Sequence, residues 1–101
     1  MILEIRDVGR KTPGDGRLEI TEATFRRLSM EQELRATVDD VKASALLERM
    51  PCTCRAGEGK AHAHWFVRSD AFRHLVPGET CVLELTSPGR LTAARPHPLA
   101  P

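Results

Sequence analysis

The chain has 101 residues, 41% of them hydrophobic, and its 15 basic and 14 acidic residues give a net charge of +1. This length suits one domain with a single core, and the hydrophobic content excludes a disordered chain. The balanced charge excludes a strongly basic nucleic-acid-binding protein but leaves room for a local basic face.

The sequence shows no sign of export or membrane insertion. No apolar run reaches the length that spans a bilayer, and Glu4 interrupts the N-terminal apolar segment before it could form a signal-peptide core. The chain has an odd number of cysteines, 3, and Cys52 and Cys54 are too close in sequence for a relaxed disulfide. We therefore expect a cytoplasmic protein with reduced thiols and no membrane association.

The first half of the chain alternates apolar and polar residues in three places, which predicts strands at residues 1–8, 17–21 and 33–38. A dense turn signal at residues 11–16 separates the first two strands. Thr21 or Thr24 suits the N-cap of a short helix over residues 22–28. The segment 41–50 fits either a strand or a helix, and we prefer the strand.

The second half predicts a hairpin, a short helix and more strands. Cys-Thr-Cys, Gly-Glu-Gly and the alternating segment 62–68 form the hairpin pattern. Ser69 and Asp70 can begin a helix near residues 69–75, and strands follow at 80–86 and 91–94. Residues 95–101 contain three prolines, so we expect one domain over residues 1–94 followed by a flexible tail.

An offset of 47 residues superimposes the two halves. It places Phe25 on Phe72, Arg26 on Arg73 and Leu28 on Leu75, and every core-type position matches an apolar residue. The pattern fits either a true duplication or the ordinary pattern of any strand–helix–strand unit. Two such units must share a core, so we predict a mainly β fold with two short helices, arranged as a small barrel or pseudobarrel of two strand–helix–strand repeats. The predicted core residues are Phe25, Leu28, Phe72, Leu75, Leu83 and Leu85.

Residues 72–85, Phe-Arg-His-Leu-Val-Pro-Gly-Glu-Thr-Cys-Val-Leu-Glu-Leu, resemble a segment of the AbrB/MazE-like and double-psi barrels. The duplicated arrangement with two end helices also resembles the DNA-binding pseudobarrel of the plant B3 and EcoRII effector domains. Either resemblance implies a barrel that binds DNA or another ligand. The first copy departs from the pattern, because Ser-Met-Glu-Gln at residues 29–32 replaces Val-Pro-Gly-Glu, and no base-contacting residue is carried over.

The sharpest chemical pattern is Cys52-Thr-Cys54 across the hairpin from His62-Ala-His64. Residues two apart on a strand share a face, and thiolate and imidazole ligands suit Zn²⁺. A three-residue loop, Gly57 to Gly59, puts Cys54 opposite His62 and Cys52 opposite His64, so that the four residues form a structural zinc site.

Two other interpretations of this hairpin stay open. A two-residue turn, Glu58-Gly59, puts the cysteines and histidines on opposite faces, where they are ordinary strand side chains. A cysteine beside a histidine is also the arrangement of a thiol nucleophile, although no cysteine-enzyme signature accompanies it.

A second pattern is basic. Under the 47-residue offset, two helix ends carry equivalent positive residues that could contact phosphates on one rim. The ordinary alternative is a solvated face, with Glu22 and Arg26 forming an ion pair one helical turn apart. The predicted nucleic-acid-binding residues are Arg26, Arg27, Arg68, Arg73 and His74.

Taken together, these patterns predict a non-enzymatic binding module with nucleic acid or another protein as its partner and with a structural zinc site. The alternative is a small metal-dependent or cysteine-based enzyme that uses Cys52, Cys54, His62 and His64. A cleft beside the hairpin would favour the enzyme, and a basic rim would favour the module.

Overall fold

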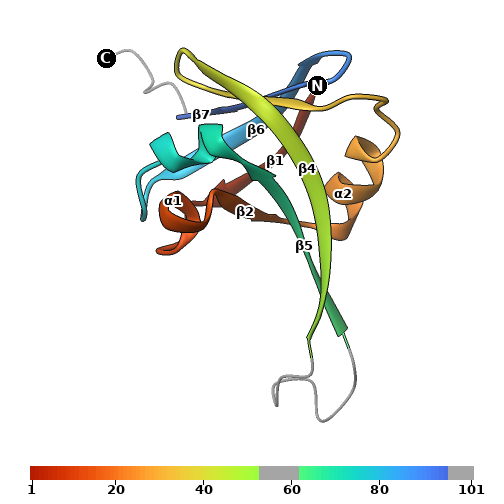
Figure 1. Cartoon of the computed structure of the whole chain (residues 1–101), viewed down its shortest axis with the longest axis horizontal. Coiled ribbons are helices and arrows are strands. Elements are labelled where there is room, and N and C mark those ends of the chain that lie inside the picture. Colours follow the sequence, from red (N-terminus) through yellow and green to blue (C-terminus); the bar gives the residue numbers. More distant parts are fainter. Residues whose placement is uncertain (53–61, 96–101) are drawn as a thin grey trace.

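The computed structural model describes residues 1–52 and 62–95. Within these residues the fold is mainly β, as predicted, with short helices between some strands (Figure 1). The elements in chain order are β1 (Ile2–Asp7), α1 (Thr12–Asp15), β2 (Arg17–Ile20), α2 (Glu22–Leu28), β3 (Arg35–Val38), β4 (Val41–Cys52), β5 (His62–Ser69), the 3₁₀-helix η2 (Asp70–His74), β6 (Thr80–Ser87) and β7 (Arg90–Ala94).

The strands form one seven-stranded sheet in the order β1-β6-β7-β3-β4-β5-β2. All neighbouring strands are antiparallel except β3 and β7, which are parallel. The end strands β1 and β2 do not pair with each other within the described residues, so the sheet is not closed and the barrel prediction is not confirmed. We call the gap between β1 and β2 the seam.

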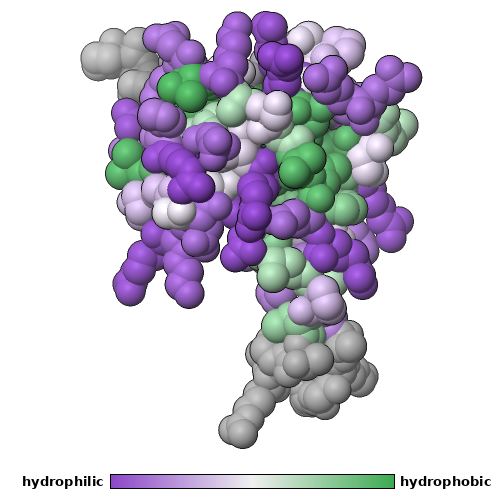
Figure 2. Space-filling view, viewed as in Figure 1, coloured by the Kyte–Doolittle hydropathy of each residue, from purple (hydrophilic) through white to green (hydrophobic). Residues whose placement is uncertain are grey.

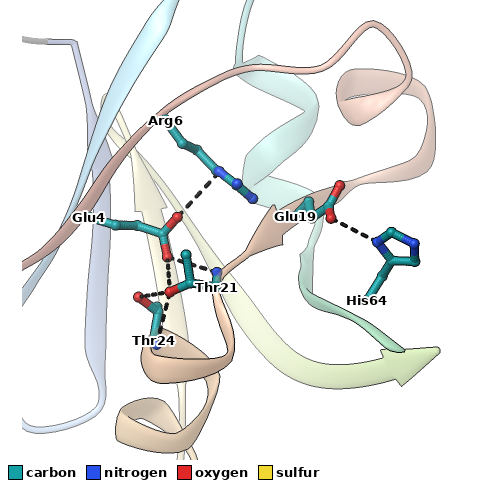
Figure 3. A network of polar contacts seen from close by, with 6 residues as sticks. All are labelled: Glu4, Arg6, Glu19, Thr21, Thr24 and His64. Carbon is teal, nitrogen blue, oxygen red and sulfur yellow. Dashed lines mark hydrogen bonds and ion pairs between the residues drawn. The ribbon is translucent and has the colours of Figure 1, made fainter. Parts of the chain in front are cut away.

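The ends of the sheet nevertheless meet at one point across the seam. A carboxylate oxygen of Glu4 in β1 accepts hydrogen bonds from the backbone N–H and the hydroxyl of Thr21, each at 3.0 Å. The same carboxylate pairs with Arg6 at 3.2 Å (Figure 3). Side chains therefore hold the seam together at this end, where main-chain pairing is missing.

The two predicted strand–helix–strand units are present in the predicted order, as β2-α2-β3 and β5-η2-β6. The 47-residue offset exchanges Leu18 with Trp65 and Ile20 with Val67. In the β2–β5 ladder Leu18 pairs with Val67 and Ile20 with Trp65. The offset therefore turns each of these two pairs into the other. The internal repeat itself stays a prediction.

Local signals explain where both helices of these units begin. Thr21 is the N-cap of α2, and its hydroxyl accepts a hydrogen bond from the N–H of Thr24 at 3.2 Å. Ser69 caps η2 in the same way, accepting from the N–H of Ala71 at 3.2 Å.

One segment differs from its sequence prediction, and the structure decides between the two alternatives for another. The predicted turn at residues 11–16 contains the short helix α1, because Pro13 lies at its start and Gly16 ends it with a left-handed φ of 65°. The ambiguous segment 41–50 is a strand, part of the long β4. Residues 96–101 of the predicted tail lie outside the described residues.

Four of the six predicted core residues are buried. Leu28, Phe72, Leu83 and Leu85 are buried, whereas Phe25 and Leu75 are partly buried and pack against the core. Hydrophilic side chains cover most of the face shown in Figure 2, with hydrophobic areas between them. No helix in the described residues has the length and apolar character that crossing a membrane requires.

Candidate metal centre

The β4–β5 hairpin carries the cysteine and histidines of the predicted zinc site on a long two-stranded arm that extends beyond the body (Figure 1). Cys52 lies directly opposite His62, and Met50 lies opposite His64. The predicted register, with Cys52 opposite His64, is therefore wrong by two residues. A shift of two keeps each side chain on its face, so Cys52, His62 and His64 share one face as expected.

The register is fixed in the body of the protein rather than at the turn. Leu47 of β4 pairs with Val67 of β5; Val67 is completely buried and Leu47 packs against the core. Sliding the strands would remove these apolar side chains from their places. The core thus determines which residues meet at the outer end of the arm.

Cys52, His62 and His64 each offer a ligand atom within 4.8 Å of the other two. All three residues are partly buried, and the rings of His62 and His64 stand edge to face with centroids 5.0 Å apart. Cys54, the fourth predicted ligand, lies outside the described residues. The structure therefore brings together three of the four predicted metal ligands.

Glu19 of the neighbouring strand β2 extends this group. Its carboxylate lies 3.0 Å from Nδ1 of His64 (Figure 3). A carboxylate on one ring nitrogen holds the proton there and leaves Nε2 free as a metal ligand, an arrangement that metal-binding histidines commonly show. Alternation with Leu18 and Ile20 places Glu19 on the outward face, but no pattern in the sequence indicates that β2 pairs with β5.

Other side chains of the same face surround the group. The guanidinium of Arg17 lies 4.6 Å from the centroid of the Phe66 ring and donates to Sδ of Met50 at 3.0 Å. Arg17 also pairs with Asp15 of α1 at 3.6 Å.

Cys81 belongs to the core and not to the metal group. It is 2% exposed. Burial raises the pKa of its thiol, and the neighbouring Arg6 guanidinium opposes this only in part. A buried thiol that stays protonated is a poor nucleophile and a poor metal ligand.

The predicted nucleic-acid-binding residues do not form one basic rim. The helices α2 and η2, which carry Arg26, Arg27, Arg73 and His74, lie on either side of the β4–β5 ribbon in Figure 1. Each arginine also has a carboxylate partner, and these ion pairs are Arg26–Glu22, Arg27–Glu31, Arg73–Asp70 and Arg68–Glu48. Nucleic-acid binding by this set stays a prediction without support from the fold.

A cavity of about 630 Å³ lies at the seam, lined by residues of β1, α1 and β2 together with Phe66. Cys52, His62 and His64 are not part of its lining. A cleft next to the metal ligands was the feature expected of an enzyme. This cavity borders the metal group through Glu19, whose carboxylate contacts His64, although none of the three ligand residues lines it.

Comparison of the chain with protein-family models, with curated proteins and with solved structures returns no match.

Proposed function

We propose that this protein is a non-enzymatic binding module of the cytoplasm whose β4–β5 hairpin is stabilised by a structural Zn²⁺ ion. The observation that supports this proposal is the meeting of Cys52, His62 and His64, whose ligand atoms lie within 4.8 Å of one another. A reducing compartment fits, because a thiolate that binds metal must not be oxidised.

The donor set suits zinc. Thiolate and imidazole are the usual ligands of structural zinc, with bond lengths of about 2.0–2.3 Å. Such bonds place neighbouring ligands of a tetrahedron about 3–4 Å apart, so the three atoms need to approach by about 1 Å. Glu19 supports the same ion indirectly, by fixing His64 with its Nε2 available.

Zinc would act on the arm rather than on the core. The arm is two-stranded at its outer end, and an isolated pair of strands is marginally stable in water. An ion that joins Cys52 of β4 to His62 and His64 of β5 would lock the two strands together. Cys54 is the predicted fourth ligand, which would complete a closed site without an open position for a substrate.

The first prediction concerns metal content. Protein purified without chelators should contain about one zinc ion per chain, and Cys52→Ser should remove it. A chelator should lower the melting temperature of the wild-type protein but not that of Cys52→Ser, because a ligand bound only to the folded state stabilises it. Affinity should fall as the pH decreases, because protons compete for the thiolate and the imidazoles.

The matched control is His74→Gln, which changes an exposed histidine outside the group and should retain zinc, whereas His64→Gln should lose it. Cys54→Ser tests the fourth ligand separately. Wild-type protein without stoichiometric zinc, or zinc retained in both Cys52→Ser and His64→Gln, would refute the proposal.

The second prediction isolates the role of Glu19. Glu19→Gln should weaken zinc binding by about 10–100-fold, because removing the carboxylate from Nδ1 of a ligating histidine lowers the affinity by this amount. Zinc affinity is measured by competition with a chromophoric chelator. Glu22→Gln on α2 removes a surface carboxylate that pairs with Arg26 and should leave the affinity unchanged; equal effects of the two variants would contradict the assignment.

A further inference from the structure

The seam is a gap in the main-chain pairing of the sheet. It lies between the two end strands of the sheet, and a cavity of about 630 Å³ separates them. Volumes of this size are typical of ligand-binding pockets. What the cavity accepts can be inferred from the groups that face it.

Main-chain groups face the seam from both sides. Val8 N–H bonds to Glu79 of the turn before β6, and the carbonyl of Gly16 bonds to Ser69 at the end of β5. Residues of an antiparallel ladder bond alternately to one side and the other. The N–H and C=O groups of Ile5 and Asp7 in β1, and those of Arg17 and Glu19 in β2, therefore point into the seam.

Thr21, just after β2, has a backbone N–H that also points into the seam, and this N–H has a partner. Thr21 follows Arg17 and Glu19 in the alternation, and its N–H is bonded at 3.0 Å by the Glu4 carboxylate, which reaches across from β1 (Figure 3). Glu4 thus closes one end of the seam. Beyond Glu4, no backbone–backbone bond joins β1 to β2 within the described residues.

One strand of the fold, β7, already has the mixed pairing that a strand inserted into the seam would have. β7 lies between β6 and β3, antiparallel to the first and parallel to the second. The sheet connects β1 to β2 through five antiparallel pairings and one parallel pairing, so β1 and β2 run in opposite directions. A strand inserted between them would have the same mixed pairing as β7.

The charges of the lining favour an acidic guest. Four cations and three carboxylates line the cavity; of the carboxylates, Asp15 pairs with Arg17, whereas Asp7 and Glu19 are hydrogen-bonded to Thr80 and His64. Two cations of the lining, Arg10 and Lys11, form no ion pair with any residue of the described ranges. Their charge is available to a carboxylate of the guest.

We propose that the seam between β1 and β2 binds an extended, acidic peptide segment of a partner protein by strand addition. The main-chain groups of both edges bind the peptide backbone, and Arg10 and Lys11 bind its carboxylates. Ile5, which is 63% exposed, offers an apolar contact to the peptide. Strand addition at the seam requires no bound zinc, although Glu19 belongs to both sites.

The test uses a fluorescein-labelled hexapeptide of alternating valine and glutamate, blocked at both ends, added to the full chain. Fluorescence anisotropy should show saturable binding. The double variant Arg10→Glu with Lys11→Glu should weaken it at least about tenfold. The control Lys42→Glu with Arg90→Glu makes the same change of charge at exposed positions outside the seam and should bind as the wild type does.

Amide hydrogen exchange locates the peptide. Binding should slow exchange at Ile5, Asp7, Arg17 and Glu19, whose N–H groups point into the seam. A hexapeptide of alternating valine and lysine, or one with proline at its third and fourth positions, should not bind, because proline cannot donate the backbone bond.

Several outcomes would overturn the proposal. They are an absence of saturable binding at about 1 mM peptide, equal losses in the two double variants, and protection of amides elsewhere in the chain. Protection of the same four amides by inorganic phosphate would identify a small-anion site. Their protection in the protein alone, together with dimerisation, would identify a second copy as the occupant.

Discussion

Phe72→Ala should lower the free energy of unfolding by about 3–5 kcal/mol, the cost of deleting a buried phenylalanine ring. Phe72 is 0% exposed and is the largest fully buried side chain in the described residues. It lies on η2, which packs against β3 and β4 on one side and contacts α1 on another. Its removal would leave a cavity at the centre of these contacts, and denaturant unfolding measures the loss.

Phe25→Ala provides the comparison, because the 47-residue offset makes Phe25 the equivalent of Phe72. Phe25 is only partly buried on α2, so its replacement should cost less. Should Phe72→Ala not fold, Phe72→Leu keeps most of the apolar volume and should still be less stable than the wild type. An unchanged unfolding curve for Phe72→Ala would remove this residue from the core.

The second large effect is expected at Gly89, in the turn between β6 and β7. Its φ is +75°, and a Cβ atom there would lie 2.3 Å from the carbonyl oxygen of Glu33. The N–H of Gly89 also donates to the Glu31 carboxylate at 2.8 Å, and its carbonyl accepts from Arg35 N–H at 2.8 Å. Gly89 thus fixes the approach to β3.

Gly89→Ala should therefore destabilise the protein by about 2–5 kcal/mol. About 1–2 kcal/mol comes from the left-handed backbone, and displacing the Glu33 carbonyl would weaken hydrogen bonds that contribute about 0.5–3 kcal/mol each. Gly14→Ala is the control, because no atom lies within 4 Å of its added Cβ and its φ is not positive. It should be neutral or slightly stabilising, and a similar loss in both variants would contradict the argument.

Much of the fold could be predicted because its signals are local. Alternating residues identified β2, β3, β5 and β6, and the caps Thr21 and Ser69 marked where α2 and η2 begin. These features depend on neighbours in the sequence, which the periodicity of side chains reports directly.

The missing features depend on residues far apart in the chain. The position of β7 between β6 and β3, and the failure of β1 to pair with β2, leave no trace in local alternation. The segment 11–16 was predicted as a turn but contains a helix of one turn. Proline and glycine are common in loops, but proline also suits the start of a helix and glycine its end.

The candidate site was predicted in kind but not in detail. Strand parity puts His62 and His64 on one face, and only the three-residue-loop alternative puts Cys52 there too; the observed register differs from that alternative by two residues and keeps the shared face. The pairing register of β4 and β5 could not be predicted in the same way. A three-residue Gly-Glu-Gly turn predicts Cys52 opposite His64, whereas the register observed in the core pairs Leu47 with Val67. Glu19 was missed because its contact with His64 joins residues 45 positions apart.

That contact also ties the two proposed sites into one thermodynamic system. Glu19 belongs to β2, whose free edge borders the seam, while its carboxylate contacts the ring of His64, a proposed zinc ligand. Reciprocity of linked binding requires that, if an occupant of one site shifts Glu19, the free energy of binding at the other site changes by an equal amount in both directions. Under the two proposals, the affinity for a peptide at the seam would then depend on the zinc concentration through this one carboxylate.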